Sequence, residues 1–501
     1  MKKSLLCFLI LLMVPLASMA DDFEVDGIYY KLTGNSGVAV SVTYKGDDPW
    51  SSDYTGPYSG HITIPSTVNY KNKSYAVTSI GDDAFSHCSG LTSITIPKSV
   101  TSIGDGAFAY CSGLTSITIP EGVTSIGDWA FYGCSSLTSI TIPNGVTSIG
   151  DGTFSGCSSL TSITIPEGVT SIGQSAFYNC SGLTSITIPE RVTSINREAF
   201  SGCSGLTSVT IPECVTSIGY WAFSDCKSLT SITIPKGVTS IGYQTFYGCS
   251  SLTSVICKSK KPAYCEDGSV FSSYQPRLII PIGSEEAYAS ATAWKEFTNR
   301  SVFKTFDHAV ATFADAEKID LDNAYQVGDE KTFAAAATKD LKAYQFTGNA
   351  VNGTIYGTEV KGIVPAGTGL LMSGTEGATY VFPLTSGDAT ADVSGNKLVG
   401  VTTDTNLSTL TDGNSHYVYD NDVFRLQNTG TIAANKAYLS LPTSDTDKIN
   451  VSLGGATGIE DIAADNEDNG AWYTLDGVKV NEKPTVKGLY IHNGKKVIIN
   501  K

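Results

Sequence analysis

Apolar and polar residues alternate with a fixed period through the middle of the chain. The unit VTSIGDDAFSHCSGLTSITIPKS begins at Val77, and close copies of it follow every 23 residues. Within each copy the same offsets carry Leu, Ile, Phe and Cys, while Ser, Thr and Gly fill the positions between them. A fixed period of this length predicts a stack of identical coils, which is a repeat solenoid. The copies begin at Val77, Val100, Val123, Val146, Val169, Val192, Val215 and Val238.

Each copy predicts one coil. In the segment LTSITIP, the alternation of Leu91, Ile94 and Ile96 with polar residues indicates a short parallel strand, and the proline after it ends the strand. The following V-T-S-I-G is expected to form a return leg. The segment A-F-A-Y-C is expected to form one tight helical turn that buries Phe108 and Cys111. Stacked coils bury these side chains continuously, at about 1.5–3 kcal/mol for each large one. The fold class is therefore a leucine-rich-repeat solenoid with a parallel sheet on one face and short helical turns.

The repeat carries a resemblance to a known family. The unit V-T-S-I-G-x-x-A-F-x-x-C-x-x-L-T-S-I-T-I-P resembles the BspA-type leucine-rich repeats of bacterial cell-surface proteins, over roughly residues 60–300. Members of that family are secreted or exposed on the cell surface, and some are adhesins for host matrix proteins or other bacteria. The resemblance implies binding rather than catalysis.

The sequence outside the repeats predicts further segments. Short β-type runs precede the repeats, and alternating β patterns with Gly, Asn and Asp turns follow them, which is typical of an all-β sandwich-like domain. An irregular coil is expected to close each end of the solenoid. The segments are a signal peptide (1–20), an N-terminal β region and cap (21–76), eight repeats (77–260), a C-terminal cap (261–300), an all-β domain (301–455), an acidic linker (456–470) and a small β module (471–501).

The first residues predict export. MKKSLLCFLILLMVPLASMA has a basic start, a short apolar core and a small-x-small cleavage site that ends at Ala20. No later stretch approaches the ~20 apolar residues of a transmembrane helix. The formal net charge of −15 argues against nucleic acid as a partner. We therefore expect a secreted or outer-surface protein.

The last residues resemble a sorting domain. The segment GLYIHNGKKV and the final lysine are similar to the C-terminal sorting domains of the type IX secretion pathway, although the match is shorter than the usual domain. Asp476-Gly477 and Asn493-Gly494 are hairpin turn signals in this module.

The cysteines are predicted to belong to the core. Eight of them lie 23 residues apart, at one offset of the repeat, so they should stack as an inward ladder. Coils ~4.8 Å apart would permit disulfides between neighbours, but thiols packed as small hydrophobes are the favoured interpretation. Cys257 and Cys265 flank a short loop and are candidates for a disulfide, whereas Cys214 is expected to be an exposed thiol.

Two sets of residues are candidates for partner binding. The first is the outward face of the strands, where hydroxyl side chains repeat without variation. It is interpreted as a solvated sheet face, as a platform for a protein or glycan, or as a hydroxyl lattice that orders water. This set comprises Ser116, Thr118, Ser139, Thr141, Ser162, Thr164, Ser185 and Thr187.

The second set lies where the copies differ. Exposed Tyr and Trp favour recognition surfaces, and the alternative is partial packing of rings along the edge of the coils. This variable aromatic stripe comprises Trp129, Tyr132, Tyr178, Tyr220, Trp221, Tyr243 and Tyr247.

The sequence gives little indication of chemistry. No HExxH, Walker or G-x-S-x-G motif is present, so no metal, cofactor or catalytic residue is predicted. Asp465, Glu467 and Asn469 loosely imitate a calcium loop, but an acidic linker explains them better. Three functions are open: binding of a host or bacterial surface protein or glycan, a self-associating surface coat, and a glycan-active enzyme within residues 301–455.

Overall fold

The structure is a computed structural model that divides into two compact units. The solenoid unit contains residues up to 255 together with 262–276 and 291–296, and the second unit contains 256–261, 277–290 and 297–501. The predicted signal peptide, acidic linker and calcium-like loop lie outside the described residues. The structure describes residues 21–33, 38–45, 56–306, 310–315, 317–329, 334–336, 340–347, 354–376, 378–386, 388–412, 414–420, 423–427, 429–442, 448–453, 472–474, 479–480, 488–492 and 495–499.

The solenoid unit begins with an antiparallel sheet. Strands β1, β2 and β3 pair in that order, and β3 then pairs in parallel with β6, which also pairs with β5. The end of β6 pairs with the next coil through Ile80 and Ile103, so the N-terminal sheet continues into the solenoid. The strands are β1 (Phe23–Val25), β2 (Ile28–Thr33), β3 (Ala39–Thr43), β5 (Thr67–Tyr70) and β6 (Lys73–Ile80).

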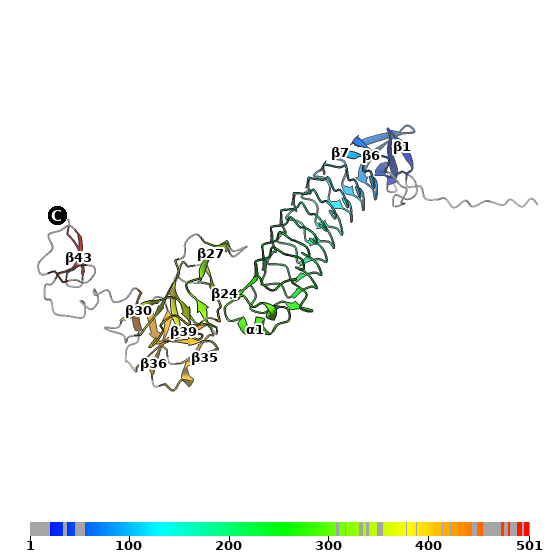
Figure 1. The fold of residues 1–501 in the computed structure, drawn as a ribbon. Helices are drawn as coiled ribbons and strands as arrows, with labels where there is room; N and C mark the ends of the chain where they lie inside the picture. Colours follow the sequence, from blue (N-terminus) through cyan, green and yellow to red (C-terminus); the bar gives the residue numbers. More distant parts are fainter. Residues whose placement is uncertain are drawn as a thin grey trace, which may run out of the picture. The chain divides into compact units, whose positions relative to one another are not determined.

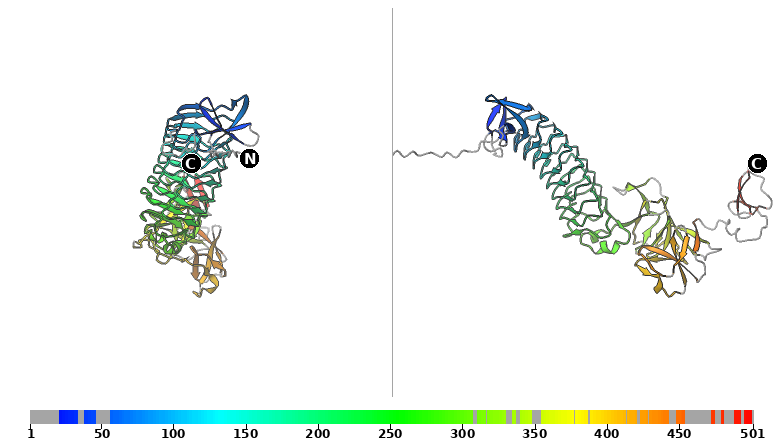
Figure 2. Two further views of the ribbon diagram at one scale, coloured as in Figure 1. Left: turned by 90° about the vertical axis from the view of Figure 1, so that its right-hand side faces the viewer. Right: turned by 180° about the vertical axis from the view of Figure 1, so that it is seen from behind.

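Each coil contributes two parallel strands. We call those from the LTSIT segment the A strands and those from the TSI segment the B strands. Equivalent residues of neighbouring coils pair in register, as Ser116 does with Ser139 and Ser217 with Ser240. Figure 1 shows the coils stacked in chain order, from cyan to green, and Figure 2 shows the same stack from two further sides.

The A strands are β4 (Gly60–Thr63), β7 (Leu91–Thr95), β9 (Ser116–Thr118), β11 (Ser139–Thr141), β13 (Ser162–Thr164), β15 (Ser185–Thr187), β17 (Ser208–Thr210), β19 (Ser231–Ile234) and β21 (Ser254–Cys257). The B strands are β8 (Ser102–Ile103), β10 (Ser125–Ile126), β12 (Ser148–Ile149), β14 (Ser171–Ile172), β16 (Ser194–Ile195), β18 (Ser217–Ile218), β20 (Ser240–Ile241) and β22 (Tyr264–Cys265). The leucine-rich-repeat solenoid predicted from the 23-residue period is confirmed.

The A-F-x-x-C segment is not helical, in contrast to the expected helical turn. It is a run of turns in which backbone groups pair between coils: the Phe108 amide donates to the Ala130 carbonyl at 2.7 Å, and the Tyr110 amide donates to the Tyr132 carbonyl at 2.6 Å. Tyr110 has a left-handed φ of +59°. Left-handed residues interrupt the local i→i−4 pattern of a helix, so the amides bond to the next coil instead.

Phe rings and Cys thiols form two continuous columns in the core. The rings of Phe85 and Phe108 stack 5.2 Å apart and almost parallel, and the column continues to Phe271. The Cys111 thiol donates to the Phe85 carbonyl at 3.0 Å, and burial raises the pKa of this thiol well above its usual value. The prediction of buried ladder thiols is confirmed, and Cys214 is exposed as expected.

The disulfide considered for Cys257 and Cys265 is not formed, which corrects that expectation. Both residues are buried thiols. Cys265 pairs in register with Ile241, so it takes the inward position that Ile holds in each B strand, and its thiol points to the Ala263 carbonyl at 3.7 Å. Cys257 ends the buried stretch of β21. Each thiol is therefore used as a core side chain.

The solenoid unit ends on an aromatic plug. Phe271 stacks on Phe246 at 5.3 Å, and the Trp294 ring packs edge-on against Phe271 at 5.9 Å. The Trp294 indole donates to the Ala263 carbonyl at 2.8 Å. Trp294 lies in the short 3-10 helix η1 (Trp294–Glu296) and is fully buried.

The second unit is almost entirely β, as expected. Strands β23, β24, β33 and β27 pair in that order, and a nine-stranded sheet follows the order β25-β32-β29-β30-β40-β37-β36-β39-β34. Its core includes Phe346, Leu371, Tyr417, Phe424 and Leu439. The helices are α1 (Glu285–Ser290) and the 3-10 helix η2 (Leu407–Thr409).

The strands of the second unit up to residue 453 are β23 (Arg277–Pro281), β24 (Arg300–Thr305), β25 (Val310–Phe313), β26 (Ile319–Asp320), β27 (Tyr325–Asp329), β28 (Ala334–Ala335), β29 (Lys342–Gln345), β30 (Thr354–Val360), β31 (Ile363–Val364), β32 (Leu370–Ser373), β33 (Thr379–Pro383), β34 (Leu398–Val401), β35 (Thr405–Asn406), β36 (Asn414–Asp420), β37 (Val423–Leu426), β38 (Thr431–Ile432), β39 (Lys436–Pro442) and β40 (Lys448–Leu453).

The C-terminal residues form a small antiparallel sheet in the order β42-β41-β43-β44. The two predicted hairpin turns fall outside the described residues, but the strands on either side of each turn pair. The strands are β41 (Trp472–Thr474), β42 (Lys479–Val480), β43 (Gly488–His492) and β44 (Lys495–Ile499).

Candidate binding surfaces of the solenoid

The A strands present the predicted hydroxyl face to solvent. All eight predicted residues, from Ser116 to Thr187, are exposed, while the Ile between each Ser and Thr is buried. Neighbouring threonines bond along the stack to backbone carbonyls, as Thr138 Oγ1 donates to the Thr115 carbonyl at 3.3 Å. The face is therefore regular and polar, and one coil differs little from the next.

The B strands present a second hydroxyl face that sequence reasoning missed. Thr147 and Thr170 are exposed, and Thr170 Oγ1 donates to the Thr147 carbonyl at 3.3 Å. The signal is the repeated T-S-I, in which two polar residues precede a buried one, although this segment by itself predicts only a return leg.

The predicted aromatic residues do not form one stripe. Counting the first Val of each copy as slot 1, they occupy slots 6, 7 and 10, which follow the B strand. The structure gathers five of them into two clusters in different coils. Tyr178 lies in a coil that contributes to neither cluster, and Tyr247 shares a coil with Tyr243 but belongs to neither cluster. Both are exposed.

The N-terminal aromatic cluster consists of His87, Tyr110, Trp129 and Tyr132. The Tyr110 and Tyr132 rings meet edge-on at 4.9 Å, the Trp129 and Tyr132 rings at 5.3 Å, and His87 stacks on Tyr110 at 4.6 Å. A hydrogen bond with Tyr132 raises the pKa of the Tyr110 hydroxyl. Sequence reasoning missed His87 and Tyr110, although both occupy slot 11, which is Gly in four of the eight copies.

Glycines of the next coil provide the floor on which these rings lie. A Cβ at Gly152 would lie 2.2 Å from Trp129 Cε3, and a Cβ at Gly133 would lie 3.1 Å from Tyr110 Cδ1. The aromatic residue of one coil and the glycine of the next are therefore a matched pair. Trp129 still has 42% of its surface exposed.

The C-terminal aromatic cluster consists of Arg197, Tyr220, Trp221, Tyr243 and Gln244. Trp221 is its centre: its indole donates to Gln244 Oε1 at 2.8 Å, and its ring meets Tyr243 edge-on at 5.7 Å. The Arg197 guanidinium stacks 4.7 Å above the Trp221 ring and pairs with Glu198 at 3.0 Å. These contacts favour this arrangement of Arg197 and Trp221.

A pocket of about 330 Å³ lies beside this cluster. Its aromatic sides are Tyr220, which is 46% exposed, and Tyr264, which is 68% exposed. The Tyr220 hydroxyl donates to Glu266 Oε2 at 3.5 Å. The pocket is lined by Arg197, Ser217, Ile218, Gly219, Tyr220, Ser240, Ile241, Gly242, Tyr264 and Glu266.

Sequence reasoning assigned Tyr220 to a binding surface but missed Tyr264 and Glu266, because both lie in the irregular cap. The register shows what Tyr264 replaces: it pairs with Ser240 and takes the outward position of Ser in β22. Aligning Tyr264-Cys265 of the cap with Ser240-Ile241 of the last repeat would have identified Tyr264 as an outward-facing residue.

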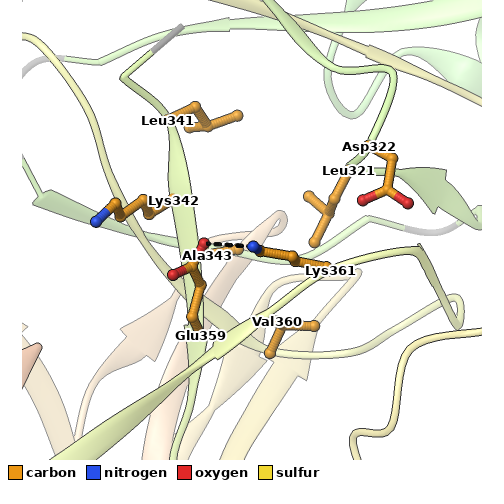
Figure 3. A pocket seen from close by; sticks show the side chains of 8 residues that line it. All are labelled: Leu321, Asp322, Leu341, Lys342, Ala343, Glu359, Val360 and Lys361. Carbon is orange, nitrogen blue, oxygen red and sulfur yellow. Dashed lines mark ion pairs between the residues drawn. The ribbon is translucent and has the colours of Figure 1, made fainter. Parts of the chain in front are cut away.

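A second pocket, of about 290 Å³, lies in the second unit (Figure 3). Lys361 pairs with Glu359 at 3.7 Å, and none of the lining residues is a Ser, Cys or His. In the part of the chain that the structure describes, no group of three or more His, Cys, Asp or Glu residues is placed to hold a metal ion. The lining residues are Leu321, Asp322, Leu341, Lys342, Ala343, Glu359, Val360 and Lys361.

The repeat region matches a known family. The family described as "BspA type Leucine rich repeat region (6 copies)" matches residues 78–207 and 170–281. Residues 78–281 are a BspA-type leucine-rich-repeat region. Both aromatic clusters and the pocket at Tyr264 lie within this BspA-type region, whereas most of the second unit lies outside it.

Solved structures similar to this chain include other leucine-rich-repeat proteins. One from T. pallidum is 28% identical, over 41% of this chain and 90% of that one, with a TM-score of 0.36. One from Bacteroides ovatus is 29% identical, over 54% of this chain and 81% of that one, with a TM-score of 0.39. The pneumococcal vaccine antigen PcpA is 14% identical, over 54% and 96%, with a TM-score of 0.28. No curated protein matches the chain.

Proposed function

We propose that the chain is an exported cell-surface binding protein, adhesin-like, whose BspA-type solenoid recognises a protein or a glycan. The observation that carries this proposal is the C-terminal aromatic cluster with its pocket, on coils that otherwise repeat with little change. Tyr, Trp and Arg side chains dominate the energetics of recognition surfaces. The role is binding, without catalysis.

Surface localisation is part of this proposal. It is supported by the signal-peptide pattern of residues 1–20, by the BspA-type repeats and by the type IX-like C-terminal end. Within the described residues, no helix combines the length and the apolar character that crossing a bilayer requires.

The test is an unbiased binding screen of the purified chain against host matrix proteins and a glycan array. For any partner found, the double variant Tyr220→Ala/Trp221→Ala should weaken binding by about 30-fold or more, because two central ring contacts are lost. A strand-face variant, Ser139→Ala/Thr141→Ala, serves as the matched control and should bind as the wild type does.

Thermal unfolding of both variants establishes that the fold is intact. Full affinity in the Tyr220→Ala/Trp221→Ala variant would contradict the proposal. A chain that binds no partner but self-associates with rising concentration would favour the alternative, a surface coat built through the regular hydroxyl faces.

A further inference from the structure

The size of the pocket beside Tyr264 limits what it can hold. A volume of about 330 Å³ is at the small end of ligand pockets, so it suits a single ring-sized group rather than a helix or strand of a partner. It is lined on one side by Ser217–Gly219 and Ser240–Gly242, which contain the paired strands β18 and β20 of the regular sheet. The site is therefore built on rigid elements.

The residues that line the pocket offer both apolar surfaces and hydrogen-bonding groups. Tyr220 and Tyr264 offer ring faces, the Arg197 guanidinium only donates, and the Glu266 carboxylate only accepts. A pyranose ring has this combination, because one of its faces is apolar C–H and its edge carries hydroxyls that donate and accept. An aliphatic side chain would use only the ring faces, and an acidic sugar would meet the charge of Glu266.

Two of the lining side chains, Arg197 and Tyr220, already have packing partners. Arg197 stacks on Trp221 at 4.7 Å and pairs with Glu198 at 3.0 Å, which favours the orientation seen here. The Tyr220 ring lies against Gly242, where a Cβ would be 2.4 Å from Tyr220 Cδ1. Binding therefore orders few side chains, which keeps its entropic cost low.

From these observations we propose that this pocket binds one neutral pyranose unit of a glycan. Tyr264 and Tyr220 stack on the sugar ring, Arg197 donates to its hydroxyls and Glu266 accepts from them. The inference rests on the proposed binding function and names the ligand class for one of its sites.

The test uses the full chain and the methyl pyranosides of glucose, galactose, mannose and N-acetylglucosamine, with affinity measured by calorimetry or saturation-transfer NMR. At least one should bind with a dissociation constant on the order of 1 mM, as expected for a single small ligand. Tyr264→Ala should weaken that binding by about 10-fold or more, since it removes one stacking face. Tyr264→Phe should retain it.

The matched control is Tyr178→Ala, which removes an exposed Tyr from another coil and should leave the affinity unchanged. Methyl glucuronide should bind more weakly than methyl glucoside, because Glu266 repels its carboxylate while the charge of Arg197 is already balanced by Glu198. Glu266→Gln should reduce that difference. Equal affinity in the wild type and Tyr264→Ala would overturn the proposal, as would a preference for the glucuronide.

The outcome separates this inference from the proposed function. If none of the methyl pyranosides binds while Tyr220→Ala/Trp221→Ala still abolishes partner binding, the sugar assignment is wrong and the binding function stands. If the pyranosides bind through Tyr264 but neither the matrix proteins nor the array glycans are recognised, the pocket assignment stands and the proposed adhesin-like function falls.

Discussion

At the scale of single residues, glycine has two different roles in the repeat. The Gly after the B strand is required by close approach, because a Cβ at Gly127 would lie 2.5 Å from the Asp105 amide nitrogen. Gly152 has a left-handed φ of +58° and also lies under the Trp129 ring. The first role recurs from coil to coil, except in the copy that begins at Val192, which has Asn196 at this position. The second role accompanies an aromatic residue in the preceding coil.

The pairing of Trp129 with Gly152 leads to a testable expectation. Gly152→Ala should destabilise the solenoid by about 2–4 kcal/mol, through the left-handed backbone and overpacking against the ring together. In a Trp129→Ala background the overpacking part disappears, so the same substitution should cost only about 1–2 kcal/mol. Urea denaturation of the four members of this double-mutant cycle measures both values.

The control for this cycle is Gly122→Ala, whose added Cβ would meet the Lys98 carbonyl at 3.5 Å and the Val100 carbonyl at 3.7 Å, both ordinary contacts. It should change the free energy of unfolding by about 0.5–1 kcal/mol at most. If Gly152→Ala costs the same with and without the Trp129 ring, the ring does not rest on this glycine.

At the scale of the coil, the A strand and the core were predictable, and the turn segment was not. Alternation in LTSIT and the following Pro indicated the strand, its buried positions and its end. A B strand such as Ser102–Ile103 is too short to reveal a period of two. The helical turn was excluded by the left-handed φ of Tyr110, a residue type that rarely adopts that conformation.

The candidate site was predictable only in part for a related reason. Slots 6, 7 and 10 lie within five residues of each other in every copy. Which rings meet depends on how neighbouring coils are placed, and that appears only in three dimensions. Trp221 meets Tyr243 of the next coil, and Arg197 of the previous coil stacks on it. Tyr264 enters the pocket through a register that the irregular cap concealed.

A whole coil should be removable without loss of the fold. Deletion of residues 169–191 brings residue 168 before Val192 and keeps every core column in register, because neighbouring coils pair at an offset of 23 residues. The variant should remain folded with a lower free energy of unfolding and a smaller denaturant m-value, since less surface is buried. Circular dichroism and urea denaturation measure both.

A deletion of about half a coil, residues 169–179, is the control. It places Cys180 where Val169 stood, so strands, Phe rings and thiols no longer align with the preceding coil, and the chain should lose its cooperative transition. A cooperative transition in this half-coil variant, or an unfolded whole-coil variant, would show that register between coils does not determine stability.

At the scale of the whole molecule, the two units differ in whether they bury acidic side chains. The solenoid buries Phe, Ile, Leu and Cys, and its acidic residues lie mainly at the surface. Among its described residues, the second unit buries the carboxyl groups of Glu285, at the start of α1, and Asp315, after β25. Its strands were predictable, but pairings such as β30 with β40 join segments far apart in the sequence and left no local signal.

The surroundings of Asp315 give the second unit a specific pH dependence. Desolvation by burial, followed by the charge of Glu285, raises the pKa of Asp315 to about 7, and burial also raises the pKa of Glu285. Glu317 raises both pKa values by its charge, while Lys260 lowers that of Glu285. The Glu317 amide donates to Asp315 Oδ1 at 2.8 Å, which opposes the shift without cancelling it.

Proton linkage determines whether stability rises or falls with pH. Because the folded state binds the Asp315 proton more tightly than the unfolded state, stability is highest below the unfolded pKa of about 4 and falls as the pH rises towards about 7. One proton contributes a slope of at most about 1.4 kcal/mol per pH unit.

Hydrogen exchange of peptides from β24 and β33, corrected for the intrinsic pH dependence of exchange, should show protection decreasing across this range. Asp315→Asn, which cannot ionise, should flatten the decrease, while peptides from β11 and β13 provide the reference in both proteins. Parallel curves for the wild type and Asp315→Asn would mean that Asp315 ionises at its ordinary pKa in the folded chain.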